Sequence, residues 1–167
     1  MQDQLHQLAQ AVGQALTAKG WLLGCAESCT GGLLASVLTD ASGASAWFCG
    51  GVVAYANAVK RDVLGVSQAL LEAKGAVSRE AVLAMAKGAR GVLRADVSVA
   101  ISGIAGPTGG TPQKPVGTVW MAWEGPQGAT VARFEFAGDR LAVKRLAVRE
   151  ALAGVLALAG GGSAPAQ

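Results

Sequence analysis

The stretch AESCTGG, residues 26–32, combines several side chains that could take part in catalysis. It lies between the apolar runs WLLGC and LLASVL, which is typical of a junction between a strand and a helix. Ser28, Cys29 and Thr30 offer possible nucleophiles, and Glu27 could orient a partner or receive a hydrogen bond. One interpretation is turn chemistry alone, because hydroxyl side chains cap helices and glycine permits tight bends. The other is a site in which backbone N–H groups face an anion or a developing oxyanion.

A second unusual segment is residues 103–117, which contain five glycines, three prolines, two threonines and one lysine. So many glycines indicate that the backbone approaches a ligand closely or adopts positive φ, although an ordinary long turn remains the alternative. The segment matches neither the P-loop nor the dinucleotide-binding pattern. Ligands in open α/β sheets collect beyond the carboxyl ends of the strands, so both segments are predicted at that end.

The histidine count limits which base could activate a hydroxyl. The only histidine, His6, lies in a predicted early helix away from both segments, so a Ser–His or Cys–His pair has no base. A lysine is the other partner for a serine nucleophile, provided that its pKa is lowered. Lys60 follows the apolar stretch VVAYAN, which contains Tyr55, and lies five residues after this tyrosine. A strand-to-helix turn there could fold both side chains over the strand end. The residues alone make a Ser–Lys site one hypothesis among others.

Composition excludes several classes of protein. The chain has 167 residues, of which 51% are hydrophobic and 15% charged, which is typical of one folded domain. No apolar run approaches the roughly 20 residues that span a bilayer, and the polar start is unlike a signal peptide, so we expect a cytoplasmic protein without a membrane partner. With a net charge of +3 and the basic stretch 143–149 read as a solvated helix face, we expect no nucleic acid partner. The three cysteines, Cys25, Cys29 and Cys49, lack metal-binding spacing and are interpreted as small buried residues, so we expect no metal.

The elements that must position these residues follow from periodicity and turn signals. We predict helices at 3–19, 30–39, 58–64, 67–73, 79–93 and from 140 to about 159, and strands at 21–26, within 45–57, and at 95–102, 118–124 and 129–136. Asp3, Ser78 and Asp139 are the predicted helix caps. The order indicates a three-layer α/β/α domain over residues 1–160, with a mixed, mostly parallel sheet and one late hairpin, followed by a flexible tail at 161–167.

Four stretches in order resemble the C-terminal domain of the competence/damage-inducible CinA proteins: AESCTGGLLA, SAWFCGGVVAYANAVKRDVLGV, GAVSREAV and SGIAGPTGGTPQKPVGTVW. The resemblance runs over residues 5–158. Stand-alone members are nicotinamide mononucleotide amidohydrolases, and the resemblance implies this deamidation with no metal or organic cofactor. It also leads us to expect the single-domain form, a small-molecule nucleotide substrate and a homo-oligomer.

The resemblance implies a serine, tyrosine and lysine site, which falls on Ser28, Tyr55 and Lys60. Ser45 of GASAW lies in another matching stretch and is the competing nucleophile or helper, while the helix start favours Ser28. Thr30 is expected to cap the helix or bind substrate. The remaining predicted substrate-binding residues supply backbone groups, hydroxyls or positive charge: Gly31, Gly32, Ser102, Gly103, Ala105, Gly106, Thr108, Gly109, Gly110, Thr118, Arg140 and Arg145.

Two functions remain open at this point. The first is the amidohydrolase, and the second is a non-catalytic pyridine-nucleotide-binding or competence-related accessory module. The presence of Ser28, Tyr55 and Lys60 together favours the enzyme, because a protein that only binds a nucleotide has no use for a lysine base.

Overall fold

The computed structural model of the protein describes residues 1–160, and the tail expected at 161–167 lies outside the described residues. Its helices are α1 (Gln2–Lys19), α2 (Leu33–Thr39), α3 (Asn57–Asp62), α4 (Gln68–Lys74), α5 (Arg79–Val92) and α6 (Arg140–Ala159), with a 3-10 turn at Ala44–Ala46. Its strands are β1 (Leu23–Glu27), β2 (Phe48–Val53), β3 (Val97–Gly103), β4 (Thr118–Gly125) and β5 (Gly128–Glu135).

The strands form one sheet in the order β2-β1-β3-β4-β5. The central strand pairs β1/β2 and β1/β3 are parallel, whereas β3/β4 and β4/β5 are antiparallel, so only β4 runs against the others. The late hairpin joins β4 to β5 through Gly125 and Gly128. The predicted fold class, a mixed and mostly parallel sheet with a late hairpin, is confirmed.

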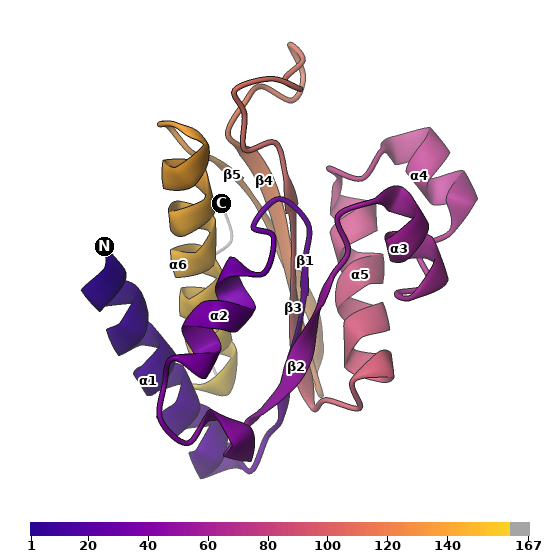
Figure 1. Ribbon diagram of the computed structural model, residues 1–167. Helices are drawn as coiled ribbons and strands as arrows, with labels where there is room; N and C mark the ends of the chain where they lie inside the picture. Colours follow the sequence, from indigo (N-terminus) through magenta and orange to yellow (C-terminus); the bar gives the residue numbers. More distant parts are fainter. Residues whose placement is uncertain (161–167) are drawn as a thin grey trace.

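Helices cover both faces of the sheet, as Figure 1 shows: α1, α2 and α6 lie on one face, and α3, α4 and α5 on the other. The central strands β1 and β3 are buried along nearly their whole length, which explains why they read as apolar runs rather than alternating patterns. Two glycines allow close packing. Gly154 of α6 leaves room for Trp123, and a side chain on Gly88 of α5 would collide with the carbonyl of Leu64, just after α3. The second contact fixes how closely α3 approaches α5.

Two of the three predicted helix caps are confirmed. The hydroxyl of Ser78 accepts a hydrogen bond from the N–H of Ala81, and the carboxylate of Asp139 accepts one from Ala142. The predicted cap at Asp3 is wrong, because α1 begins earlier and Met1 occupies the cap position. Asp3 therefore lies in the first turn, where a carboxylate still complements the positive end of the helix.

Candidate active site

The candidate site lies at the carboxyl ends of the parallel strands, where three connections meet. Ser28 directly follows β1, and its N–H donates to the carbonyl of Ile101 in β3, which fixes the backbone of this residue. Lys60 lies on α3, just beyond the end of β2. Residues 103–117 project from the same end of the sheet, and α6 begins there after β5 (Figure 1).

Lys60 is buried with an exposed fraction of 1%, and its amine is surrounded by three oxygen atoms. Nζ lies 3.0 Å from Ser28 Oγ, 2.8 Å from the carbonyl of Ala54 and 3.1 Å from the carbonyl of Tyr55. A protonated lysine can donate to all three oxygens. A neutral amine can donate to the two carbonyls and accept the proton of the Ser28 hydroxyl with its lone pair. The Lys60 amine thus has hydrogen-bond partners in both the protonated and the neutral state, which are the two states that a proton acceptor passes through.

Burial lowers the pKa of the Lys60 ammonium from its ordinary value, and the neighbouring Cys29 acts in the opposite direction. Burial raises the pKa of the Cys29 thiol to about 11, while the positive charges of Arg140 and Lys144 lower it to a smaller extent. The thiol is therefore protonated near neutral pH, which disfavours Cys29 as the nucleophile. The same environment favours a neutral lysine beside Ser28.

Glu27 holds the start of α2. Its carboxylate is buried, with an exposed fraction of 1%, and it accepts hydrogen bonds from the N–H groups of Gly32, Leu34 and Ala35 at 2.9–3.2 Å. These donors would otherwise lack partners at the helix N-terminus. Glu27 itself is thus the anion at this helix start, and its role in the structure is to position the turn that carries Ser28.

The turn between β1 and α2 differs from the predicted helix 30–39, because α2 begins only at Leu33. Gly31 and Gly32 have positive φ values of 61° and 95°, which explains the need for glycine. The N–H of Gly31 donates to the carbonyl of Ser28, and that of Gly32 donates to Glu27, so neither is free for an oxyanion.

Two other N–H groups remain available in the same turn. Within residues 1–160, the N–H groups of Cys29 and Thr30 donate to no other residue. The hydroxyl of Thr30 is fully buried and also lacks a partner among the described residues. The two N–H groups follow Ser28 directly, which is where a tetrahedral oxyanion would need them, whereas the Thr30 hydroxyl is enclosed by the protein.

Arg140 joins the glycine-rich segment to Tyr55. Its guanidinium donates to the carbonyl of Gly106 at 2.7 Å and to the hydroxyl of Tyr55 at 3.2 Å. Tyr55 is 62% exposed, and it forms a hydrogen bond with Lys60 only through its backbone carbonyl. Tyr55 therefore approaches the lysine through its main chain, and its hydroxyl points to Arg140.

The other predicted binding residues of this segment have different surroundings. The Ser102 hydroxyl donates to the carbonyl of Ala76 and is already paired, whereas the Thr118 hydroxyl is buried without a partner among the described residues. Gly103 pairs with Val119 inside the sheet. Ala105 is buried, and the exposed members of the set are Thr108, Gly109 and Gly110.

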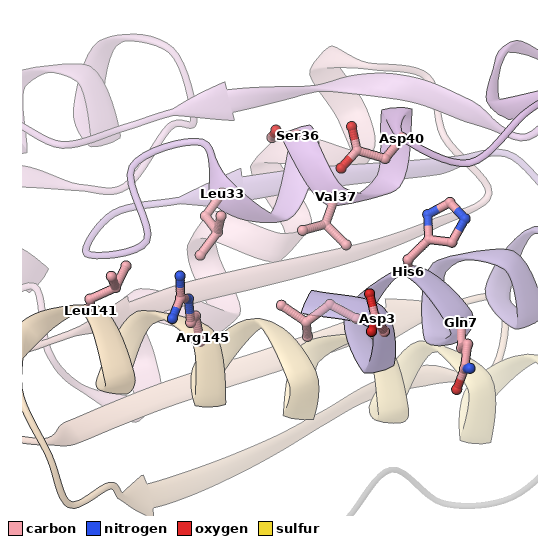
Figure 2. A pocket seen from close by; sticks show the side chains of 10 residues that line it. Asp3, His6, Gln7, Leu33, Ser36, Val37, Asp40, Leu141 and Arg145 are labelled. Carbon is pink, nitrogen blue, oxygen red and sulfur yellow. The ribbon is translucent and has the colours of Figure 1, made fainter. Parts of the chain in front are cut away.

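Two predicted residues lie elsewhere. Ser45 is exposed in the 3-10 turn before β2, at the opposite end of the parallel strands from Ser28. Arg145 lines a cavity of about 550 Å³ between α1, α2 and α6, together with Asp3 and Asp40 (Figure 2). This cavity includes neither Ser28 nor Lys60, so the structure does not bring Ser45 or Arg145 together with them.

A residue that the sequence analysis passed over does reach the turn. Lys144 Nζ lies 3.7 Å from the position that a Cβ on Gly31 would occupy. Lys144 follows Arg140 by four residues, so both side chains lie on the same face of α6. This spacing was the available signal, and it distinguishes Lys144 from its neighbour Arg145.

The chain belongs to the CinA family, since the model of the CinA C-terminal domain matches residues 5–159. It is 52% identical over 144 residues to nicotinamide-nucleotide amidohydrolase PncC of Enterobacter agglomerans, covering 86% of this chain and 88% of that protein. It is 51% identical over 151 residues to the protein of the same name from Escherichia coli K12, covering 90% and 92%. A CinA superfamily protein from Klebsiella pneumoniae has a similar solved structure, with a TM-score of 0.91 at 41% identity over 94% of this chain and 98% of that one.

Two further properties of the described residues bear on the site. None of the helices within residues 1–160 is long and apolar enough to cross a membrane. The same part of the chain contains no group of three or more histidine, cysteine or carboxylate side chains placed to hold a metal ion.

Proposed function

We propose that this protein hydrolyses the carboxamide of nicotinamide mononucleotide to give nicotinate mononucleotide and ammonia, with Ser28 as nucleophile and Lys60 as base. The observation that carries the proposal is the 3.0 Å contact between Lys60 Nζ and Ser28 Oγ, at a lysine that is buried and held by two carbonyls. The class of activity, an amidohydrolase, is that of relatives about 51% identical over most of the chain.

The reaction would proceed in two steps. Lys60 takes the proton of the Ser28 hydroxyl as Oγ attacks the carboxamide carbon, and the oxyanion is stabilised by the N–H groups of Cys29 and Thr30. The Lys60 ammonium then gives its proton to the departing nitrogen. The nitrogen leaves as ammonia, and the acyl group remains as an ester on Ser28. Water attacks this ester while Lys60 accepts one of its protons, and the Lys60 ammonium then returns that proton to Ser28 Oγ as the C–O bond to Ser28 breaks. The nicotinate product leaves, and both the Ser28 hydroxyl and the neutral Lys60 amine are restored.

The substrate would lie across the mouth of this turn. Arg140 and the exposed part of the glycine-rich segment are the groups that support binding of a polar, anionic nucleotide. The glycine-rich segment provides backbone groups without carboxylates, which fits a ligand carrying phosphate.

The test is turnover by purified protein after treatment with EDTA. Incubation with nicotinamide mononucleotide should release ammonia and nicotinate mononucleotide in equal amounts. The matched controls are Lys60→Met, which should be inactive, and Lys87→Met on the outer part of α5, which should be unaffected. Tight binding without ammonia release would favour the accessory binding module. Loss of activity on chelation with recovery on adding zinc would contradict the Ser–Lys reaction.

A further inference from the structure

Two positive side chains on the first turns of α6 lack an acidic partner within residues 1–160. Among the described residues, neither Arg140 nor Lys144 forms an ion pair. Arg140 donates to a carbonyl and to a tyrosine hydroxyl, and Lys144 makes no side-chain hydrogen bond within the same part of the chain. Uncompensated positive charges beside a buried serine are a binding surface for an anion.

Glycine at position 31 makes room for the lysine. Gly31 is exposed, and a Cβ there would lie 3.7 Å from Lys144 Nζ. The N–H of Gly31 bonds back to the carbonyl of Ser28, so the ammonium lies against the turn that carries the nucleophile. Lys60 reaches this turn from α3 and Lys144 reaches it from α6, and these two helices cover opposite faces of the sheet (Figure 1).

The neighbouring Arg145 provides an internal comparison. Consecutive residues of an α-helix differ in direction by about 100°, and Arg145 accordingly faces the cavity that Asp3 and Asp40 also line (Figure 2). Among the described residues Arg145 forms no ion pair either, but two carboxylates line the cavity that it faces. Lys144 forms no ion pair within the described part of the chain, and the carboxylate of Glu27 in the adjacent turn is buried and accepts from the N–H groups at the start of α2.

We propose that Lys144 is a substrate-binding residue that, together with Arg140, holds the phosphate of the nucleotide and makes the enzyme specific for phosphorylated substrates. This inference rests on the proposed function, because it assumes that the reacting amide lies at Ser28. The phosphate is the anionic end of the mononucleotide, and the two cations lie beside the turn rather than at the Lys60 side of it. Arg140 sets the position of the Gly106 carbonyl, while Lys144 supplies a free charge with three donors.

The experiment compares Lys144→Met with two control variants, Lys144→Arg and Arg145→Met. Methionine keeps the apolar stem of lysine and removes only the charge. Calorimetry measures binding of ribose 5-phosphate, which has the phosphate and no amide, and of nicotinamide riboside, which has the amide and no phosphate. Steady-state turnover of nicotinamide mononucleotide is measured with the same proteins.

In Lys144→Met we expect the Kd for ribose 5-phosphate and the KM for the mononucleotide to rise together by about tenfold, which corresponds to one charge-assisted hydrogen bond. The Kd for nicotinamide riboside and kcat should change by less than about twofold, because Lys144 does not touch the amide. Lys144→Arg should retain phosphate binding, and Arg145→Met should leave all four quantities unchanged.

Three results would overturn the inference: unchanged binding of ribose 5-phosphate in Lys144→Met, equal weakening of both ligands, or a fall in kcat at constant KM. The last would place Lys144 at the reacting centre. If Arg145→Met alone weakened ribose 5-phosphate, the phosphate would belong to the other face of α6. A wild-type protein that binds ribose 5-phosphate through Lys144 but releases no ammonia would contradict the proposed function and leave only the phosphate-binding role of Lys144 standing.

Discussion

Two lysines approach the turn after β1 from opposite layers of the fold, and their surroundings differ sharply. Lys60, from α3, is 1% exposed and has three oxygens within 3.1 Å. Lys144, from α6, is partly exposed and, among the described residues, has no side-chain partner. Burial lowers the pKa of the first, which suits it to accept a proton. Lys144 lies beside the turn without an ion-pair partner among the described residues, which suits it to bind an anion. The same residue type thus serves two different tasks according to desolvation.

The largest expected effect comes from removing the buried amine. Lys60→Met should lower kcat by about 10³-fold or more, because the Ser28 hydroxyl loses its proton acceptor. Lys60→Arg should be equally inactive, since a guanidinium keeps its proton at any ordinary pH. Stopped-time ammonia release measures both. Substantial activity in Lys60→Arg would mean that the position requires positive charge rather than a base, and the contrast with Lys144 would fail.

A smaller loss is expected from the loop that Arg140 holds. Gly106 has φ of 82°, and a Cβ there would lie 2.5 Å from Val116 Cγ1. Gly106→Val should therefore displace the carbonyl bonded to Arg140 and raise KM for the mononucleotide by about tenfold to a hundredfold, with a smaller change in kcat. Gly128→Val is the matched control, because Gly128 also has positive φ but no atom near its Cβ. Unchanged KM in a folded Gly106→Val protein would remove this loop from the binding site.

Tyr55→Phe distinguishes between two roles for the tyrosine. Its hydroxyl bonds to Arg140, and only its carbonyl contacts Lys60, so we expect loss of the hydroxyl to change kcat/KM by less than about tenfold. The change should appear mainly in KM. A fall in kcat of the size produced by Lys60→Met would instead give Tyr55 a direct part in proton transfer.

The smallest effect concerns stability as a function of pH. Because the folded-state pKa of Lys60 is lowered, the unfolded chain binds one more proton between that pKa and about 10.4, the unfolded value. Unfolding then takes up a proton, so the free energy of unfolding rises with pH across this window. The slope should exceed that of Lys60→Met by up to about 1.4 kcal/mol per pH unit, measured by urea unfolding. Parallel curves for the two proteins would mean that the lysine is charged in the folded state.

Much of the fold follows from local patterns in the sequence. The apolar runs of β1 and β3 predict strands buried on both faces, and the hydroxyl of Ser78 and the carboxylate of Asp139 predict helix starts that the structure confirms. Ser28 and the glycine-rich segment could be placed at one end of the sheet from a general rule alone: in open α/β sheets the ligand-binding loops follow the carboxyl ends of the strands. The 3.0 Å contact between Lys60 and Ser28 is consistent with the hypothesis drawn from the sequence.

Other features depend on contacts that local patterns do not specify. From the sequence, Glu27 is only a polar residue at the end of a strand. In the structure its carboxylate accepts hydrogen bonds from the N–H groups at the start of α2, because Gly31 and Gly32 let the chain fold back over it. The direction of a basic side chain on α6 changes by about 100° per residue, so composition alone could not separate Lys144 from Arg145. Only the packing of α6 against α1 and α2 determines which of them faces the turn.

The most direct test of the account is turnover of nicotinamide mononucleotide by Ser28→Ala compared with Ser45→Ala and with the double variant Ser28→Ala/Lys60→Met. We predict that Ser28→Ala loses about 10³-fold or more in kcat, that Ser45→Ala stays near wild-type activity, and that the double variant is little worse than either of its single variants, because Ser28 and Lys60 act as one unit. Near-normal turnover by Ser28→Ala, with loss in Ser45→Ala, would contradict the account and transfer the nucleophile to the opposite end of the sheet.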